Sequence, residues 1–179
     1  MSKIGRRPIP LAGVSAKVVG RVVEYSGKSA KGAYEIPDIL QVALDGESLL
    51  ISPVKVTSDT NRLWGLHRAL LANKIKGAGE GFEKKITIVG LGFKAVKKGT
   101  TELEFSLGFS HKIMFMIPAD VKIEIDKTGQ LITAWSSDRE LLGHCCSQIC
   151  ALRPPEPYKG TGVYLQGQQI RRKAGKAKS

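Results

Sequence analysis

The residues best suited to binding chemistry lie near the C-terminus, in the run Arg153-Pro-Pro-Glu-Pro-Tyr-Lys-Gly-Thr-Gly162. Its three prolines fix an extended path and remove backbone donors, so this run cannot be a helix. The cations Arg153 and Lys159 can reach phosphates. Tyr158 can stack on a base or sugar, and Gly160 lets the backbone approach a surface closely. This combination indicates a nucleic-acid contact, although a proline-rich structural connector has a similar composition.

A cationic tail follows this run. The last ten residues, Ile170-Arg-Arg-Lys-Ala-Gly-Lys-Ala-Lys-Ser, cannot form a core of their own, and we expect them to order against an array of anions. The expected phosphate contacts in the tail are Arg171, Arg172, Lys173 and Lys176, with Lys3, Arg6 and Arg7 near the N-terminus as second-rank contacts. A basic tail taken alone is equally compatible with a solvated chain end.

The charge of the chain is concentrated at its two ends. The 179 residues include 28 Lys and Arg against 16 Asp and Glu, a net charge of +12. Residues 1–31 and 153–179 each hold seven basic residues and one acidic residue, so the ends supply the whole excess and the middle is balanced. Uncompensated charge of this size opposes compaction, and a polyanion is the simplest compensation.

An anionic membrane is the other polyanionic surface, and the sequence does not favour it. No apolar run approaches the roughly 20 residues that span a bilayer. The N-terminus lacks the apolar region and cleavage site of a signal peptide. We therefore expect a cytoplasmic protein without a membrane partner, although an organelle-encoded copy would look the same.

Two glycine-containing segments in the middle of the chain are weaker candidates. The stretch Gly90-Leu-Gly-Phe-Lys-Ala-Val-Lys-Lys-Gly99 lacks the third glycine and following helix of a dinucleotide-binding motif. It is interpreted as a β-bulge, with Lys94 able to contact phosphate. Gly108-Phe-Ser-His-Lys112 is interpreted as a loop in which His111 either reaches RNA or is an ordinary exposed histidine.

Nothing in the sequence indicates catalysis. The histidines are His67, His111 and His144, and no serine or aspartate pattern accompanies them as a catalytic site requires. The thiols of Cys145, Cys146 and Cys150 lack a second pair at zinc spacing and are expected to be small buried hydrophobes. We therefore predict no enzyme, metal site, cofactor or small-molecule substrate. A free regulator of DNA or RNA is the other alternative, but no helix-turn-helix or zinc-finger pattern supports it.

An internal repeat indicates how these residues are positioned. Val23-Glu-Tyr-Ser26 recurs as Leu103-Glu-Phe-Ser106, 80 residues later, and Ile36-Pro37 recurs as Ile117-Pro118. Ser58-Asp59 recurs as Ser137-Asp138. This ordered series predicts one fold unit used twice, with the boundary in the glycine-rich stretch near residues 77–81.

Each half is predicted to consist of short strands followed by one helix. The expected strands are 18–25, 32–36, 40–44 and 48–54, then 85–96, 101–107, 112–117, 121–125 and 131–135. The first helix would begin at Ser58 or Asp59 and end at Gly77–Gly79. Its expected apolar stripe consists of Leu63, Leu66, His67, Leu70, Leu71 and Ile75. Ser137-Asp138 would open the second helix, and Pro154-Pro155 would stop it. A brief strand at 163–165, pairing with 167–170, would follow.

The predicted class is therefore α+β, with two tandem homologous domains and a basic C-terminal tail. Each domain, 1–81 and 82–179, would be a small antiparallel sheet packed against one helix.

Several segments of the sequence resemble the family of bacterial-type ribosomal protein L6 of the large subunit. The resemblance rests on these segments in order: Ser2-Lys-Ile-Gly-Arg-Arg-Pro-Ile9, Arg68-Ala-Leu-Leu-Ala-Asn73, Val89-Gly-Leu-Gly-Phe-Lys94, Leu107-Gly-Phe-Ser-His111 and Leu152–Val163. They span nearly the whole chain. One departure is Thr161, where the family usually has a lysine, and it removes one cationic contact.

The resemblance implies a structural role without a reaction or cofactor. It implies two homologous α+β domains and binding to large-subunit ribosomal RNA, mainly through the C-terminal half. It places that contact near the loop where translational GTPase factors dock, with neighbouring large-subunit ribosomal proteins as further partners.

Overall fold

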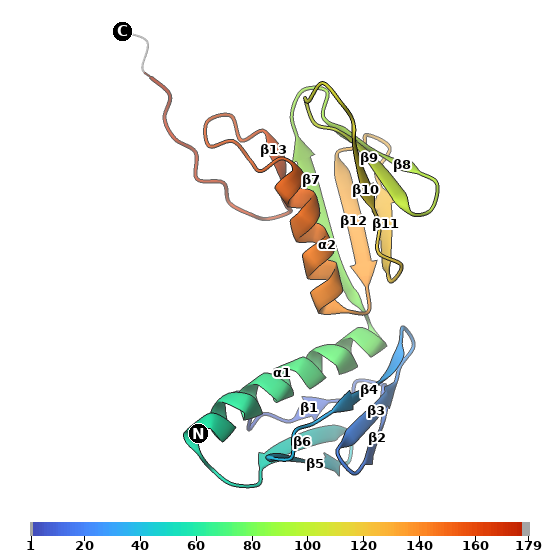
Figure 1. The fold of residues 1–179 in the computed structure, drawn as a ribbon, viewed down its shortest axis with the longest axis vertical. Coiled ribbons are helices and arrows are strands. Elements are labelled where there is room, and N and C mark those ends of the chain that lie inside the picture. Colours follow the sequence, from blue (N-terminus) through green and yellow to red (C-terminus); the bar gives the residue numbers. More distant parts are fainter. Residues whose placement is uncertain (1, 177–179) are drawn as a thin grey trace. The chain divides into compact units, whose positions relative to one another are not determined.

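The computed structural model describes residues 2–176. Contacts between Cα atoms divide the chain into two compact units, Met1–Gly81 with Ser137–Arg139, and Phe82–Ser136 with Glu140–Ser179. Each unit combines one α-helix with antiparallel sheets, so the class is α+β (Figure 1).

The first unit contains two antiparallel sheets. One has the order β2–β3–β4 and the other β1–β6–β5. In chain order the strands are β1 (Ile9–Pro10), β2 (Ser15–Val19), β3 (Val22–Ser26), β4 (Lys31–Glu35), β5 (Leu40–Asp45) and β6 (Ser48–Pro53). The expected strand at 18–25 is therefore wrong, because the chain turns back at Gly20-Arg21 and forms the β2–β3 hairpin. Val19 pairs with Val22 directly across this turn.

Helix α1 (Ser58–Gly79) follows β6 and packs against strands of both sheets of the first unit. Its N-cap is Thr57, whose hydroxyl accepts a hydrogen bond from the Thr60 amide and so replaces the expected Ser58 or Asp59 cap. The buried face carries Trp64, Leu71 and Ile75, whereas Leu66 is 50% exposed. Leu71 and Ile75 are therefore buried as predicted, whereas the predicted burial of Leu66 is wrong. Trp64 is anchored by its indole Nε1, which donates to the Ile51 carbonyl at 2.7 Å.

The second unit also contains two antiparallel sheets, of order β10–β9–β8 and β11–β12–β7–β13. Its strands are β7 (Phe82–Val89), β8 (Lys94–Lys98), β9 (Glu102–Ser106), β10 (Ile113–Met116), β11 (Val121–Ile125), β12 (Leu131–Ser136) and β13 (Gly162–Leu165). The expected strand at 85–96 is wrong because residues 90–93 form a turn, in which the Phe93 amide donates to the Gly90 carbonyl at 3.2 Å. The β-bulge predicted for this stretch is wrong too, because the same turn stands in its place. The expectation of one sheet per half is wrong as well.

Helix α2 (Arg139–Leu152) ends just before Pro154, as predicted. It shares one core with both sheets of its unit, where Leu142, Cys145 and Ile149 meet Phe105 and Val163. The expected pairing of residues 163–165 with 167–170 is wrong, because β13 pairs with β7, with Val163 opposite Ile88. A strand next to the C-terminus therefore completes the second core.

Candidate nucleic-acid interface

The residues between α2 and β13, here called the proline loop (153–161), form a closed and hydrogen-bonded structure. The Glu156 amide donates to the Thr161 carbonyl at 2.9 Å, and the Gly160 amide donates to the Glu156 carbonyl at 2.9 Å. At its base the Val163 amide donates to the Arg153 carbonyl at 2.8 Å. Because β13 holds one end and α2 the other, the loop is presented by rigid elements.

The predicted contact residues of the proline loop differ in exposure. Tyr158 is 55% exposed and Lys159 is also exposed, so both are available to a partner. Gly160 is buried, and Arg153 is half-buried. Thr161 donates from its hydroxyl to a Glu156 carboxylate oxygen at 3.2 Å. At the position where the family usually has lysine, the chain therefore carries a neutral side chain turned toward the loop's own acid.

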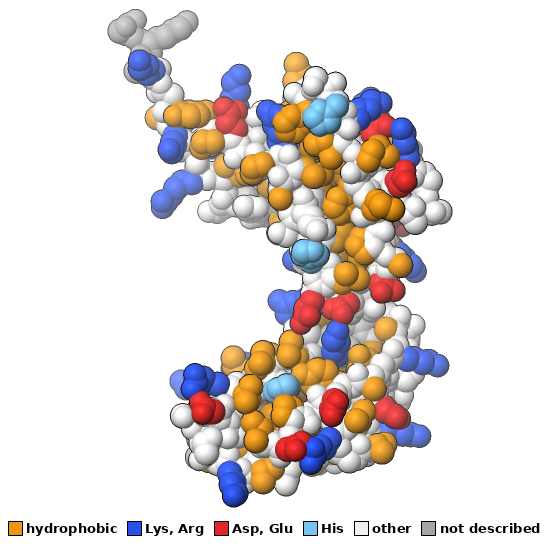
Figure 2. All heavy atoms as spheres, in the orientation of Figure 1, with side chains coloured by type: hydrophobic (Ala, Val, Ile, Leu, Met, Phe, Trp, Pro, Cys, Tyr) orange, Lys and Arg blue, Asp and Glu red, His pale blue; other side chains and the backbone are white. Residues whose placement is uncertain are grey.

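The described part of the basic tail (170–176) returns to the proline loop. The Lys173 amide donates to the Pro157 carbonyl at 2.8 Å. The Arg172 guanidinium lies against Gly160, where a Cβ would be 3.0 Å from one of its nitrogens. Arg171, Lys173 and Lys176 are exposed, and Figure 2 shows Lys and Arg side chains spaced along this segment. The loop and the tail therefore form one cationic surface. Lys178, which contributes to the charge of the C-terminal end, lies outside the described residues.

Arg153 itself belongs to a cluster of rings, here called the Arg153 stack (Phe93, Phe109, His111 and Arg153). Its guanidinium carbon lies 4.7 Å from the Phe109 ring centroid and 5.5 Å from that of Phe93. Phe109 in turn stacks with His111, with centroids 6.0 Å apart and ring planes at 25°. These contacts bring the β7–β8 turn, the β9–β10 loop and the C-terminal end of α2 together.

The segments of Phe93 and His111 continue into lysines of the β8–β9–β10 sheet region. Lys94 begins β8 and is exposed. Lys112 follows His111, and its ammonium lies 2.6 Å from the carboxylate of Glu104. Lys98 contacts the same carboxylate at 2.6 Å, and these two hydrogen bonds lower the pKa of Glu104. Lys94 and His111, the two RNA contacts predicted in the middle of the chain, are both exposed on the second unit.

The N-terminal candidates lie in the first unit. Gly5 packs flat on Trp64, since a Cβ there would be 2.5 Å from the indole. Arg68 then holds the following residues, donating from Nε to the Arg7 carbonyl at 3.1 Å and from Nη2 to the Pro8 carbonyl at 2.8 Å. The side chains of Lys3, Arg6 and Arg7 are exposed on this arm. All three lie in the first unit.

Phe93 and Phe109 were missed by the sequence reasoning, which considered only cations, Tyr158 and His111. A signal was present, because both phenylalanines lie next to glycines in the two segments singled out, Gly90–Phe93 and Gly108-Phe109. Small residues beside a ring allow close packing against it. The cation–π partner could not be predicted, because Arg153 is distant in sequence.

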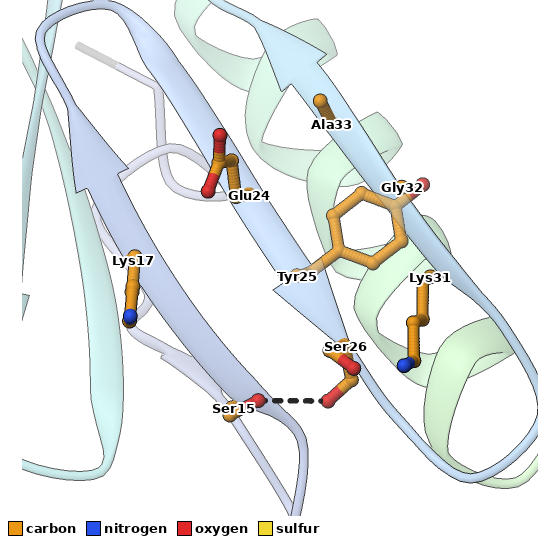
Figure 3. A pocket seen from close by; sticks show the side chains of 8 residues that line it. All are labelled: Ser15, Lys17, Glu24, Tyr25, Ser26, Lys31, Gly32 and Ala33. Carbon is orange, nitrogen blue, oxygen red and sulfur yellow. Dashed lines mark hydrogen bonds between the residues drawn. The ribbon is translucent and has the colours of Figure 1, made fainter.

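The thiols and hollows do not form a catalytic site. Burial raises the pKa of Cys145 to about 11 and also raises the pKa of Cys146 and Cys150, which makes these thiols poor nucleophiles. A hollow of about 600 Å³ on the β2–β3–β4 sheet is open to solvent, and Tyr25 lies across Gly32 within it (Figure 3). Its lining residues are Ser15, Lys17, Glu24, Tyr25, Ser26, Lys31, Gly32 and Ala33. The Ser15 hydroxyl donates to the Ser26 carbonyl at 3.0 Å rather than to a base.

No helix within residues 2–176 combines the length and apolar character that crossing a membrane requires. Within the same residues, His, Cys, Asp and Glu side chains do not gather in a group of three or more that could hold a metal ion.

Comparison with known proteins places the chain in a family. The family model of ribosomal protein L6 matches residues 89–165. The large ribosomal subunit protein uL6 of Beijerinckia indica is 39% identical over 99% of this chain and 100% of its own length. Those of Magnetococcus marinus and Caulobacter vibrioides are 38% and 37% identical over the same shares. The expected resemblance is thereby confirmed, and the chain belongs to the ribosomal protein L6 family.

Proposed function

We propose that this protein is a structural, non-enzymatic component of the large ribosomal subunit and binds large-subunit ribosomal RNA through its second unit. The proline loop and the basic tail would form the main contact, with Lys94 and His111 beside it and Lys3, Arg6 and Arg7 as secondary contacts. The proposal includes a position near the docking region of translational GTPase factors and contacts with neighbouring ribosomal proteins. It also places the protein in the cytoplasmic ribosome, or in that of an organelle.

The observation that carries the proposal is the joined surface of loop and tail. The Lys173–Pro157 hydrogen bond and the packing of Arg172 on Gly160 hold cations beside the exposed ring of Tyr158. Lysine and arginine neutralise phosphates, while tyrosine and close backbone approach suit the shallow minor groove of an A-form helix. Full-length similarity to proteins named for the large ribosomal subunit supports the same role.

We further infer that the two units are homologous and arose by duplication. In each unit a three-stranded hairpin sheet is inserted after the first strand of the other sheet, and an inner strand of that other sheet leads into the helix. The order β2–β3–β4 matches β8–β9–β10, and β1–β6–β5 matches β7–β12–β11. The repeated motifs fall on matching strands, since Val23–Ser26 lies in β3 and Leu103–Ser106 in β9. The additional strand β13 and the basic tail are features of the second unit.

Cofractionation tests the ribosomal role against that of a free RNA-binding regulator. The tagged protein should sediment with large subunits and remain with them after the subunits are purified. A protein found wholly in the free fraction would contradict the proposal.

Truncation tests the site. Removing residues 153–179 would also delete β13, whose Val163 is fully buried, so the second core would be lost together with the tail. Ending the chain after Gln169 removes the tail and keeps β13. The truncated protein should bind large-subunit RNA much more weakly while keeping its circular-dichroism spectrum. Full-strength binding by the truncated chain would show that the tail is not part of the site.

A further inference from the structure

The Arg153 stack is held rigidly by glycine turns. A Cβ on Gly90 would lie 2.5 Å from the Phe93 ring, and a Cβ on Gly108 would lie 2.7 Å from it. The ring is therefore clamped between the β7–β8 turn and the start of the β9–β10 loop, at a distance that only glycine permits. Phe93 then supports the Arg153 guanidinium, which also lies over Phe109. Such packing fixes a cation that would otherwise be flexible.

The outer part of the stack is open to solvent. Phe109 is 44% exposed, and the His111 ring stacked on it is exposed as well. Leu91, in the same turn as Gly90, is fully exposed. Aromatic and apolar side chains are thus presented to solvent in segments that continue into Lys94 and Lys112, although burying them in the core would have been favourable.

This chemistry fits the face of a nucleobase. Unpaired bases bind by stacking on aromatic rings and arginine planes, while cations beside the rings neutralise the attached phosphate. A paired base in an A-form helix exposes its edge, and its faces are covered by neighbouring bases. The stack therefore suits a different RNA element from the helix backbone that the proline loop and tail would contact. A protein partner would explain the exposed rings but gains nothing from the surrounding lysines.

We propose that the Arg153 stack binds a single unpaired RNA base, which would lie on the exposed rings of Phe109 and His111. This inference rests on the proposed function, because it assigns a second and separable contact to the same RNA-binding unit. A phosphate of a flanking nucleotide would lie near Lys94, since the ammonium of Lys112 is already paired with Glu104.

Two RNA probes test the proposal with the full-length protein. One is a duplex of about 16 base pairs, and the other is the same duplex with a single bulged 2-aminopurine. Stacking should quench the 2-aminopurine fluorescence and strengthen binding to the bulged probe by about fivefold or more over the plain duplex. Phe109→Ala should remove both the quenching and the preference while leaving plain-duplex affinity unchanged, and His111→Ala should also remove the quenching and the preference. Met116→Ala, at a residue that is 74% exposed in the same unit but outside the stack, is the matched control.

The outcomes are distinguishable. Equal binding of the two probes without quenching would overturn the base-binding site and leave the proposed function standing. A loss of affinity that is the same for both probes in His111→Ala would also overturn it, because the stack would then contact only the backbone. Failure of the wild-type protein to bind either probe or large-subunit RNA would reject both proposals. Unchanged RNA binding in both variants would point to a protein partner and overturn the inference.

Discussion

Gly160 shows how a single residue shapes the proposed interface. Its backbone φ is +72°, a left-handed conformation that side chains rarely adopt, and its missing side chain leaves room for the Arg172 guanidinium. Gly160→Ala should destabilise the protein by about 1–2 kcal/mol. It should also weaken RNA binding, because the added methyl displaces Arg172.

Binding and thermal unfolding of this variant would be measured against Gly175→Ala, since Gly175 lies in the tail and nothing stands within 4 Å of its missing Cβ. Identical behaviour of the two variants would show that the contact between loop and tail is unimportant.

Glu104 is a buried acid on the β8–β9–β10 sheet, and it should make the stability of the protein depend on pH. It is 7% exposed, and hydrogen bonds from Lys112 and Lys98 lower its pKa from the ordinary value of 4.5. The folded state therefore holds this proton less tightly than the unfolded state does. Its stabilising contribution is complete above about pH 4.5 and is lost as the pH falls through the lowered pKa.

Glu104→Gln should remove that part of the pH dependence, measured by urea unfolding between about pH 3 and pH 6. The control is Glu102→Gln, at an exposed position of the same strand. If the stability of Glu104→Gln depended on pH as steeply as that of the wild-type protein, the ion pairs of Glu104 would contribute nothing to folding.

At the level of elements, the two units protect corresponding strand edges differently. In the second unit β13 pairs along β7 and buries Val163 completely. In the first unit β1 is an edge strand flanked by proline, since Pro8 and Pro10 lack N–H groups and Arg68 occupies the Pro8 carbonyl. Proline at an edge prevents pairing with another chain. The first unit therefore does not require a counterpart of β13.

Val163→Ala tests how much β13 contributes to the second core. Removing two methyl groups from a fully buried position should lower the free energy of unfolding by about 1–3 kcal/mol. The comparison variant is Val96→Ala, because Val96 lies on the edge strand β8 and is 45% exposed. Chemical unfolding of both variants would measure the difference. Equal small losses would mean that β13 is only loosely attached.

The helices show where sequence patterns suffice and where they do not. The end of α2 was predictable, because Pro154 and Pro155 forbid its continuation. The buried face of α1 was predictable only in part: Leu71 and Ile75 lie on it as predicted, but Leu66 and Trp64 both fit helical spacing with them and only Trp64 is buried. Only the position of the sheet decides between them. Similarly, the hairpin at residues 20–21 and the turn at residues 90–93, which connects two different sheets, depend on glycines within continuous β-type patterns.

The candidate site was predictable to a similar extent. Charge, proline and glycine marked the proline loop and the tail, since these features are local in sequence. The Arg153 stack joins residues 93, 109 and 153, and its geometry depends on tertiary packing. Contacts between distant residues leave no periodic signal in a single sequence.

For the whole molecule, the concentration of charge at the chain ends predicts how binding responds to salt. Each phosphate neutralised releases counterions, so contact with about six phosphates should reduce affinity roughly 1,000-fold between 50 and 200 mM salt. Replacing Arg171, Arg172, Lys173 and Lys176 by glutamine would remove up to four of these contacts while keeping the chain length.

The salt dependence of this variant should then fall to about a tenfold reduction over the same range. Replacing Lys17 and Lys31, which line the hollow on the first unit, should leave the salt dependence of RNA binding unchanged. Filter binding to large-subunit RNA across salt concentrations measures all three slopes. A tail variant with the wild-type slope would mean that the excess charge at the C-terminal end does not contact phosphates, and the electrostatic mechanism would then have to reside elsewhere on the chain.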